Sequence, residues 1–254
     1  MRAPRLSSAQ PRAQMNLSSA ASLVGPVWEG AAITNVCGVP GSVACLGRTL
    51  HERRLVLVTT QHALFGAGAP AHSPVSVVQR KDSAWQLRRI GRSGCGRRDT
   101  VRFADLDVHI DCAVVELDEQ DAVPPGWRVV EDHPAAKPPA PGEHVTKIGA
   151  ATGLTDGFVV DVAHNAQALF DGRARAAPGQ LLVRSGARGR AFAAAGDSGA
   201  VLRDAGGALV GLLWGVTGGG DGVACPIAPV LWVLHVQPVR LAPVAPLSPS
   251  THVF

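Results

Sequence analysis

The sequence lacks the patterns that mark membrane-spanning, disulfide-stabilised and long-helical proteins. No segment reaches the roughly 18 uninterrupted apolar residues of a membrane span, since even the apolar run 158–170 is interrupted by Asp161, His164 and Asn165. The five cysteines are odd in number and widely spaced, and the first residues contain no apolar core of a secretory signal. We therefore expect no membrane association, no disulfide framework, and a reducing, intracellular setting, most simply the cytoplasm.

Metal and cofactor signatures are also missing. No Cys-x-x-Cys or His-x-x-x-His spacing occurs among the five cysteines and nine histidines, so the ligand patterns typical of zinc sites are absent. The glycine-rich segment 217–222 lacks the Lys-Ser/Thr pair that completes a phosphate-binding loop. The sequence thus predicts a protein with no metal and no cofactor.

Acidic residues are absent from positions 1–28, where three arginines lie among many serines. This composition resembles that of an organellar transit peptide, although Pro4 and Pro11 would interrupt an amphipathic helix there. The two hypotheses for this arm are a targeting segment and a disordered extension.

Basic residues are concentrated between positions 80 and 102, where eight arginines and lysines accompany two aspartates. A nucleic-acid groove is one hypothesis, but proteins that bind single strands interleave aromatic side chains for base stacking, and only Trp85 and Phe103 are available here. We favour the solvated face of a hairpin or loop, and we expect no nucleic-acid partner. The pattern specifies no oligomeric state.

Short apolar runs punctuated by 29 glycines and 19 prolines fill the rest of the chain, as is typical of an all-β protein with many turns. Six prolines make 123–143 a linker that forbids helix and most sheet pairing. The segments 29–122 and 144–237 each contain five or six candidate strands. We expect two packed six-stranded antiparallel β-barrels with a cleft between them, a short C-terminal helix in 227–236, and a loose tail over 238–254.

A candidate nucleophile lies in the second half of the chain. Hydrolysis through a serine needs an imidazole that takes the hydroxyl proton and a carboxylate that orients the imidazole. Ser198 lies in the segment GDSGA, where Gly196 and Gly199 leave backbone N–H groups accessible to a substrate carbonyl. The segment is not the G-x-S-x-G elbow of α/β-hydrolases, because Ala200 occupies the last glycine position.

Candidate partners for this serine come from the first half. His62 follows the apolar run RLVLVTTQ, which predicts a histidine where a buried strand ends. The acidic candidate is less certain to assign from the pattern, because Asp105, Asp107, His109 and Asp111 alternate and share one strand face. We prefer Asp111, which directly precedes the apolar run CAVVEL.

The order of these segments resembles a known family. LVTTQHAL, DCAVVEL and GDSGAVL are similar to the three signature regions of the chymotrypsin-fold (trypsin-like) serine peptidases, in which the first barrel carries the histidine and aspartate and the second carries the serine. Residues 146–157 resemble a Lys-x-Gly-x-x-Thr-Gly-x-Thr-x-Gly turn of non-secreted members. The resemblance covers residues 30–236 and implies a serine endopeptidase that acts on a protein or peptide substrate.

The resemblance also implies roles for individual residues. Ser198 would be the nucleophile, His62 the general acid and base, and Asp111 the group that orients the imidazole. The backbone N–H groups of Gly196 and Ser198 would bind the oxyanion. The substrate-binding residues would be Phe192 at the floor of the specificity pocket, Ala193 beside it, and Leu213, Trp214 and Gly215 along an extended substrate. An uncharged floor favours a small or apolar residue at the cleaved position.

Four departures from the family pattern keep an alternative open. The cysteine that commonly follows the histidine is Ala63, and the serine that usually precedes the cleft tryptophan, a donor to the aspartate, is Leu213. The cysteines that bracket the specificity loop are missing. No Ile-Val-Gly-Gly start follows a basic cleavage site near Val27, so Asp197 needs another partner or stays solvated. The alternative is a catalytically impaired protease-fold protein that binds peptides or serves as a scaffold.

Overall fold

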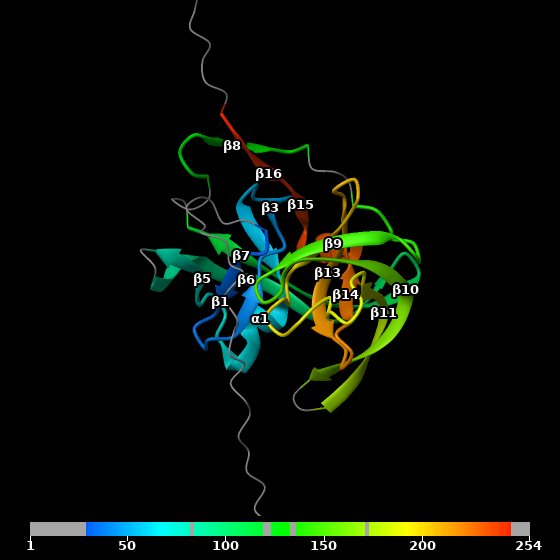
Figure 1. Cartoon of the computed structure of the whole chain (residues 1–254). Coiled ribbons are helices and arrows are strands. Elements are labelled where there is room, and N and C mark those ends of the chain that lie inside the picture. The colour runs from blue at the N-terminus through cyan, green and yellow to red at the C-terminus, as the bar shows by residue number, and fades with distance from the viewer. Residues whose placement is uncertain (1–28, 82–83, 119–122, 133–135, 171–172, 245–254) are drawn as a thin grey trace, which may run out of the picture.

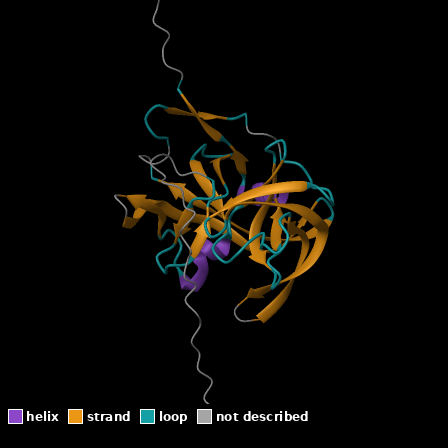
Figure 2. Ribbon diagram, viewed as in Figure 1, coloured by secondary structure: helices purple, strands orange, loops and turns teal. Residues whose placement is uncertain are grey.

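The computed structural model describes residues 29–81, 84–118, 123–132, 136–170 and 173–244. Strands dominate this part of the chain, as expected, and the two α-helices are short (Figure 2). Neither helix in the described part is long and apolar enough to cross a membrane. All five cysteines are free thiols.

The first half forms an eight-stranded antiparallel sheet in the order β15-β3-β4-β7-β6-β5-β1-β2 (Figure 1). Its strands are β1 (Ala32–Thr34), β2 (Pro40–Ser42), β3 (Cys45–Thr49), β4 (Leu55–Thr59), β5 (Pro74–Lys81), β6 (Ala84–Phe103), β7 (Leu106–Leu117) and β15 (Val236–Pro238). The sheet has two strands more than we expected. One of them, β15, comes from the C-terminal end of the chain and pairs with β3.

The second half forms the closed six-stranded barrel that the sequence predicted, in the order β10-β11-β14-β13-β12-β9. Its strands are β9 (His144–Gly149), β10 (Gly153–Phe170), β11 (Arg173–Ser185), β12 (Val201–Asp204), β13 (Leu209–Val216) and β14 (Gly222–Pro226). Inward-facing aliphatic side chains and the ring of Phe192 fill this barrel. The predicted C-terminal helix is α3 (Ile227–Leu234), which follows β14 directly.

One apolar cluster joins the two halves. Side chains of β4 and β7 pack in it against side chains of β13, β14 and α3, among them Val58, Ile110, Leu212 and Ile227. Alternate residues of β7 face this cluster or the core of the first sheet. Because both faces of β7 are covered, every residue from Val108 to Val115 is buried. A charged residue within the stretch 108–115 is therefore cut off from bulk water.

The segment expected to be an unpaired linker contributes a strand. β8 (Trp127–Val130) pairs with β16 (Arg240–Pro243), which lies in the segment expected to be a loose tail. The six prolines were expected to forbid most sheet pairing in 123–143, and this ribbon is an exception, because the four residues of β8 contain no proline and can donate and accept along the strand. An ion pair between Arg240 and Asp132 at 2.6 Å lies beside this ribbon.

Candidate active site

His62 lies at the end of a buried strand, as its sequence context predicted. β4 ends at Thr59, and the chain turns at Thr60 into the one-turn helix α1 (Gln61–Phe65), which is followed by the 3-10 turn η2 (Gly66–Gly68). Ala63 and Leu64 anchor α1 in the core. The helix therefore holds the His62 side chain, which is 25% exposed, at the boundary between core and solvent.

His62 and Asp111 are joined by two hydrogen bonds. The backbone N–H of His62 donates to Oδ1 of Asp111 at 3.1 Å, and Nδ1 of the ring lies 2.8 Å from Oδ2. With the carboxylate ionised, Nδ1 carries the proton and donates it, so Nε2 is left with its lone pair. Both the position of the ring and its tautomer are thus set by one carboxylate.

Asp111 is fully buried on β7 and lies beside a second basic side chain, that of Arg98. Burial acts to raise the pKa of this carboxyl, but His62 and Arg98 outweigh it and hold the pKa below its ordinary value. The guanidinium Nε of Arg98 lies 2.9 Å from Oδ2. The other carboxylates on this strand face are placed differently, since Asp107 is exposed and pairs with Arg102, and Asp105 lies in the β6–β7 turn. The structure therefore joins His62 to Asp111 and to neither alternative.

Ser198 lies on a loop of the second barrel that is bonded to the first sheet. The N–H of Ser42 on β2 donates to the carbonyl oxygen of Ser198 at 2.7 Å. A methyl group at Gly41 would lie 2.6 Å from Cβ of Ala63 and 3.3 Å from that same oxygen. The serine loop and the helix that carries His62 therefore approach each other across Gly41. The hydroxyl of Ser198 donates a long hydrogen bond, 3.4 Å, to the carbonyl oxygen of Trp214.

Glycine is required on both sides of the serine. Gly199 has φ +97°, and a side chain there would collide with the carbonyl oxygen of Ser42. Gly196 has φ +103°, and its carbonyl oxygen accepts a hydrogen bond from the hydroxyl of Ser42 at 2.9 Å. Within the described residues, the N–H groups of Gly196 and Ser198 donate to no protein acceptor. Both donors are therefore available to a substrate oxygen.

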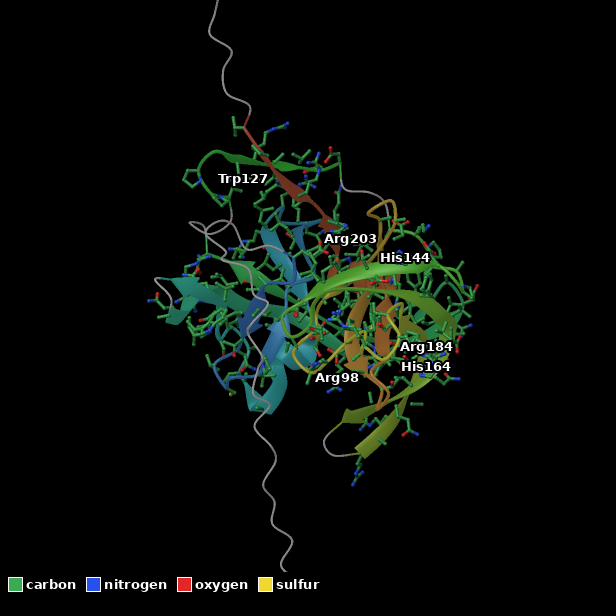
Figure 3. The ribbon with its side chains drawn as sticks, in the orientation of Figure 1. Arg98, Trp127, His144, His164, Arg184 and Arg203 are labelled. Carbon is green, nitrogen blue, oxygen red and sulfur yellow. The ribbon has the colours of Figure 1, made fainter. Side chains whose placement is uncertain are left out.

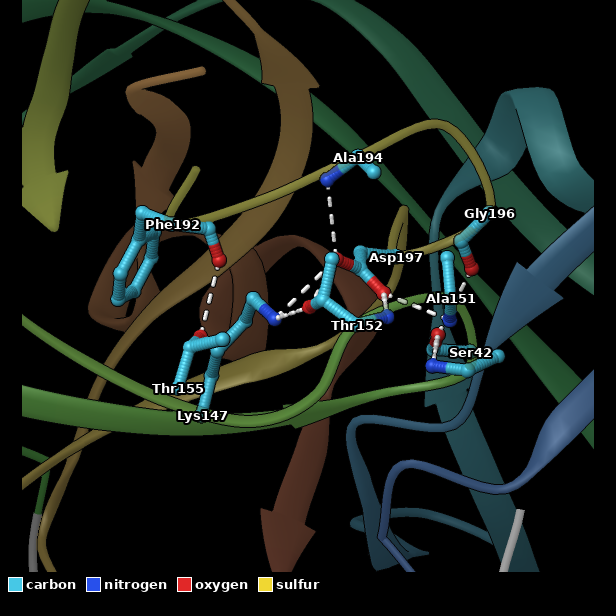
Figure 4. A network of polar contacts seen from close by, with 10 residues as sticks. Ser42, Lys147, Ala151, Thr152, Thr155, Phe192, Ala194, Gly196 and Asp197 are labelled. Carbon is cyan, nitrogen blue, oxygen red and sulfur yellow. Dashed lines mark hydrogen bonds and ion pairs between the residues drawn. The ribbon is translucent and has the colours of Figure 1, made fainter. Parts of the chain in front are cut away.

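Asp197 is not solvated but sits in a fully satisfied buried network (Figure 4). Its Oδ1 accepts the N–H groups of Ala151 and Thr152, at 2.8 and 3.1 Å. Its Oδ2 accepts the N–H of Ala194 at 3.0 Å and the hydroxyl of Thr152 at 2.7 Å. The ammonium of Lys147 lies 3.2 Å from Oδ2. Asp197 thus has the charged partner that the sequence left open.

The side chain of Lys147 is completely buried. Burial lowers the pKa of this lysine, and the opposing attraction of Asp197 does not offset it completely. The ammonium donates to the hydroxyl of Thr152 at 2.6 Å and lies 5.5 Å from the centre of the Phe192 ring. The sequence contained a signal for the contact between Lys147 and Thr152, since they are the first and third specified positions of the 146–157 turn motif.

The residues expected to line the specificity pocket are largely buried. The ring of Phe192 lies inside the second barrel, where side chains at Gly157 and Gly222 would approach it to 2.9 and 2.7 Å. Ala193 is buried beside it. The N–H groups of Phe192 and Ala193 both donate to Gly220, at 2.9 and 3.3 Å. Both side chains are therefore enclosed, and the charged group beside the ring, the Lys147 ammonium, is enclosed as well.

The strand expected to pair with the substrate is only partly free. Leu213 is buried in the barrel core, and its N–H and carbonyl are bonded to Ala200 and Gly199, so it is not available to a substrate. Its side chain and that of Trp214 lie on opposite faces, and the Trp214 ring is buried between the two halves. Gly215 is half exposed and is the predicted residue of this strand that remains accessible.

No group of three or more histidine, cysteine or acidic side chains within the described residues is arranged to hold a metal ion.

Comparison with solved structures identifies the fold as that of the chymotrypsin-like serine proteases. A glutamic acid specific serine protease with a histidine triad in substrate binding superposes with a TM-score of 0.56 and 19% identity, covering 83% of this chain and 98% of that one. Nocardiopsis protease (NAPase) superposes with a TM-score of 0.54 and 16% identity over 85% of this chain and all of that one. Thermobifida fusca protease A superposes with a TM-score of 0.54 and 19% identity over 84% of this chain and 98% of that one. No protein-family model and no curated protein matches the sequence.

Proposed function

We propose that this protein is a serine endopeptidase that hydrolyses peptide bonds through an acyl-enzyme. The observation that carries the proposal is the pair of hydrogen bonds between His62 and the buried Asp111, at 3.1 and 2.8 Å, in a protein with a chymotrypsin-like fold. Such a pair supplies a neutral imidazole with an oriented lone pair, which is the base that a serine nucleophile needs.

The proposed reaction uses groups from both halves of the molecule. Nε2 of His62 takes the proton of the Ser198 hydroxyl while Oγ attacks the carbonyl carbon of the scissile bond. The N–H groups of Gly196 and Ser198 bind the oxyanion, and the imidazolium gives its proton to the leaving amine. A water molecule then repeats the sequence on the acyl-enzyme, which releases the carboxylic acid and restores Ser198.

The buried wall around Phe192 supports a substrate with a small or apolar residue at the cleaved position. A basic side chain would find no free carboxylate there, because Asp197 is already paired with Lys147 at 3.2 Å. The ammonium of Lys147, which lies 5.5 Å from the centre of the Phe192 ring, is fully enclosed and so is not presented to an acidic side chain.

One observation favours the second candidate, a peptide-binding protein with impaired catalysis. The Ser198 hydroxyl donates to Trp214 in this structure rather than to His62. Catalytic hydrogen bonds are often long in free enzymes and shorten when substrate binds, so we place the endopeptidase first.

Labelling with a fluorophosphonate, which esterifies activated serines, separates the two candidates. We expect covalent labelling of the wild-type protein that is lost in Ser198→Ala and His62→Ala and kept in Ser76→Ala, a control for a half-buried serine on β5. Peptide substrates with Ala or Val at the cleaved position should be cut, and those with Lys or Arg should not. A folded wild-type protein that takes up no label would overturn the proposal.

A further inference from the structure

Arg98 lies directly opposite Asp111 in the sheet. The two residues are partners in the antiparallel register of β6 and β7, so their side chains project on the same face. The Nε of Arg98 is 2.9 Å from Oδ2 of Asp111, and Nδ1 of His62 is 2.8 Å from the same oxygen. One carboxylate oxygen therefore lies between the imidazole and a guanidinium. Figure 3 labels Arg98 near the junction between the two halves of the molecule.

The low exposure of both side chains strengthens the electrostatic interaction between Arg98 and Asp111. The Asp111 side chain has no exposed surface, and only 23% of the Arg98 side chain is exposed. Coulombic interactions in such a site are screened less than at the surface. An arginine also keeps its charge at every accessible pH, so Arg98 presents a constant positive charge to the His62–Asp111 pair.

The other titratable groups near Asp111 carry little charge themselves. Burial raises the pKa of the Cys112 thiol on β7 to about 12 and that of Cys225 on β14 well above its ordinary value. Burial also lowers the pKa of His109, which disfavours the protonated form of that ring. Asp99 on β6 is exposed and pairs with Arg97 at 3.7 Å. Among these neighbours, Arg98 is the one with a persistent charge in contact with the carboxylate.

In the family that the sequence resembles, a serine usually donates a hydrogen bond to the aspartate, and this chain lacks that serine. The position of the serine that donates to the aspartate is occupied by Leu213, which faces the core of the second barrel. Arg98 reaches the same carboxylate from within the first sheet. A cation there also changes the histidine, because it reduces the attraction that Asp111 exerts on a protonated imidazole.

We propose that Arg98 is a positioning residue of the active site, which holds the Asp111 carboxylate in place and makes His62 easier to deprotonate. This inference rests on the proposed function for its catalytic consequence, but the coupling of Arg98 to His62 does not depend on catalysis. An active enzyme with this residue keeps a neutral His62 at lower pH than the same enzyme without it.

The test is the titration midpoint of the His62 ring by NMR, assigned by comparison with His62→Gln. Neutral replacement in Arg98→Gln should raise this midpoint by about one pH unit, because a charge beside the carboxylate is removed. Arg98→Lys should keep the midpoint within about 0.3 unit of wild type, since the cation is retained. Arg97→Gln is the matched control, an exposed arginine one position away on the same strand, and should not shift the midpoint.

A second readout connects the residue to the reaction. The pH at which fluorophosphonate labelling reaches half its maximum rate should rise in Arg98→Gln by the same amount as the NMR midpoint and return toward wild type in Arg98→Lys. If Arg98→Gln does not fold, Arg98→Met removes the charge and keeps the packing of the aliphatic stem. An unshifted or lowered midpoint in a folded neutral variant would overturn the inference. Absence of labelling in the wild type with a shifted midpoint would overturn the proposed function alone.

Discussion

The protein buries two aspartates beside its candidate active site and supports them differently. Asp197 is paired with Lys147, whose side chain is also fully buried, and it accepts hydrogen bonds from three backbone N–H groups and the Thr152 hydroxyl. Asp111 is paired with Arg98 and with His62, and the side chains of both still reach solvent. The first arrangement is closed to water, whereas water can reach both side chains that contact Asp111 in the second.

The difference teaches what each carboxylate is able to do. The Asp197 network links the residue before the serine to the 146–157 turn with an internal cation, so the loop needs no freed N-terminal amine to be ordered. The Asp111 network keeps a titratable ring at the edge of solvent, where a proton can enter and leave. The candidate site thus combines an enclosed ion pair, Lys147–Asp197, with a His62–Asp111 pair whose imidazole reaches solvent.

Lys147→Met should have the largest effect, because it leaves the Asp197 charge buried without its cation. We expect a loss of about 3–5 kcal/mol in the free energy of unfolding, the usual result of removing one partner of a buried ion pair. Urea unfolding measures it. Lys137→Met is the control, since that ammonium also contacts two carboxylates, but its side chain is 49% exposed and its loss should lower the free energy of unfolding far less. Equal losses of unfolding free energy in the two variants would contradict the expected difference between an enclosed and an exposed ion pair.

Ser42→Ala should have an intermediate effect. The Ser42 hydroxyl donates to Gly196 and accepts the N–H of Ala150, both at 2.9 Å, so it links the serine loop to the turn that holds Asp197. Its removal leaves two buried groups unpaired and should cost about 1–3 kcal/mol. The fluorophosphonate labelling rate should fall as well, because the Gly196 peptide loses its restraint. Ser76→Ala serves again as control, and an unchanged labelling rate in Ser42→Ala would show that the peptide is held by other contacts.

The acid stability of the Asp111 site should show the smallest effect. His62 and Arg98 hold the folded pKa of Asp111 below the ordinary value of 3.8. The stabilisation from this group is therefore complete above pH 3.8 and is lost as the pH falls through the folded pKa. Urea unfolding at a series of acidic pH values should show a shallower decline in Asp111→Asn than in the wild type. A steeper decline in the variant would mean that the carboxylate destabilises the fold.

Much of the fold followed from the sequence because its signals are local. Short apolar runs between glycines and prolines predicted the strands, and the proline-rich segment separated the two halves. The pairing of β8 with β16 was missed, because the partners lie more than a hundred positions apart and neither has a distinctive pattern. The eighth strand of the first sheet, β15, was missed for the same reason.

The candidate site divides in the same way. His62, Asp111 and Ser198 could be located because each lies beside an apolar run or a glycine turn in the expected order. The basic composition of 80–102 predicts a solvated surface for Arg98, and only the strand register shows that it faces Asp111. The 146–157 motif contains Lys147 but indicates no role for it, because its burial depends on how the second barrel closes.

The pairing of β15 with β3 has a consequence for the order of assembly. Three residues near the C-terminal end, Val236–Pro238, complete a sheet that begins about two hundred positions earlier, and α3 packs against β7 on the way. Contacts of such long range are slow to form and come last during synthesis. A nascent chain would therefore lack part of the first sheet until residues 236–238 have emerged, so the sheet that carries His62 and Asp111 is completed only after the second barrel has been synthesised.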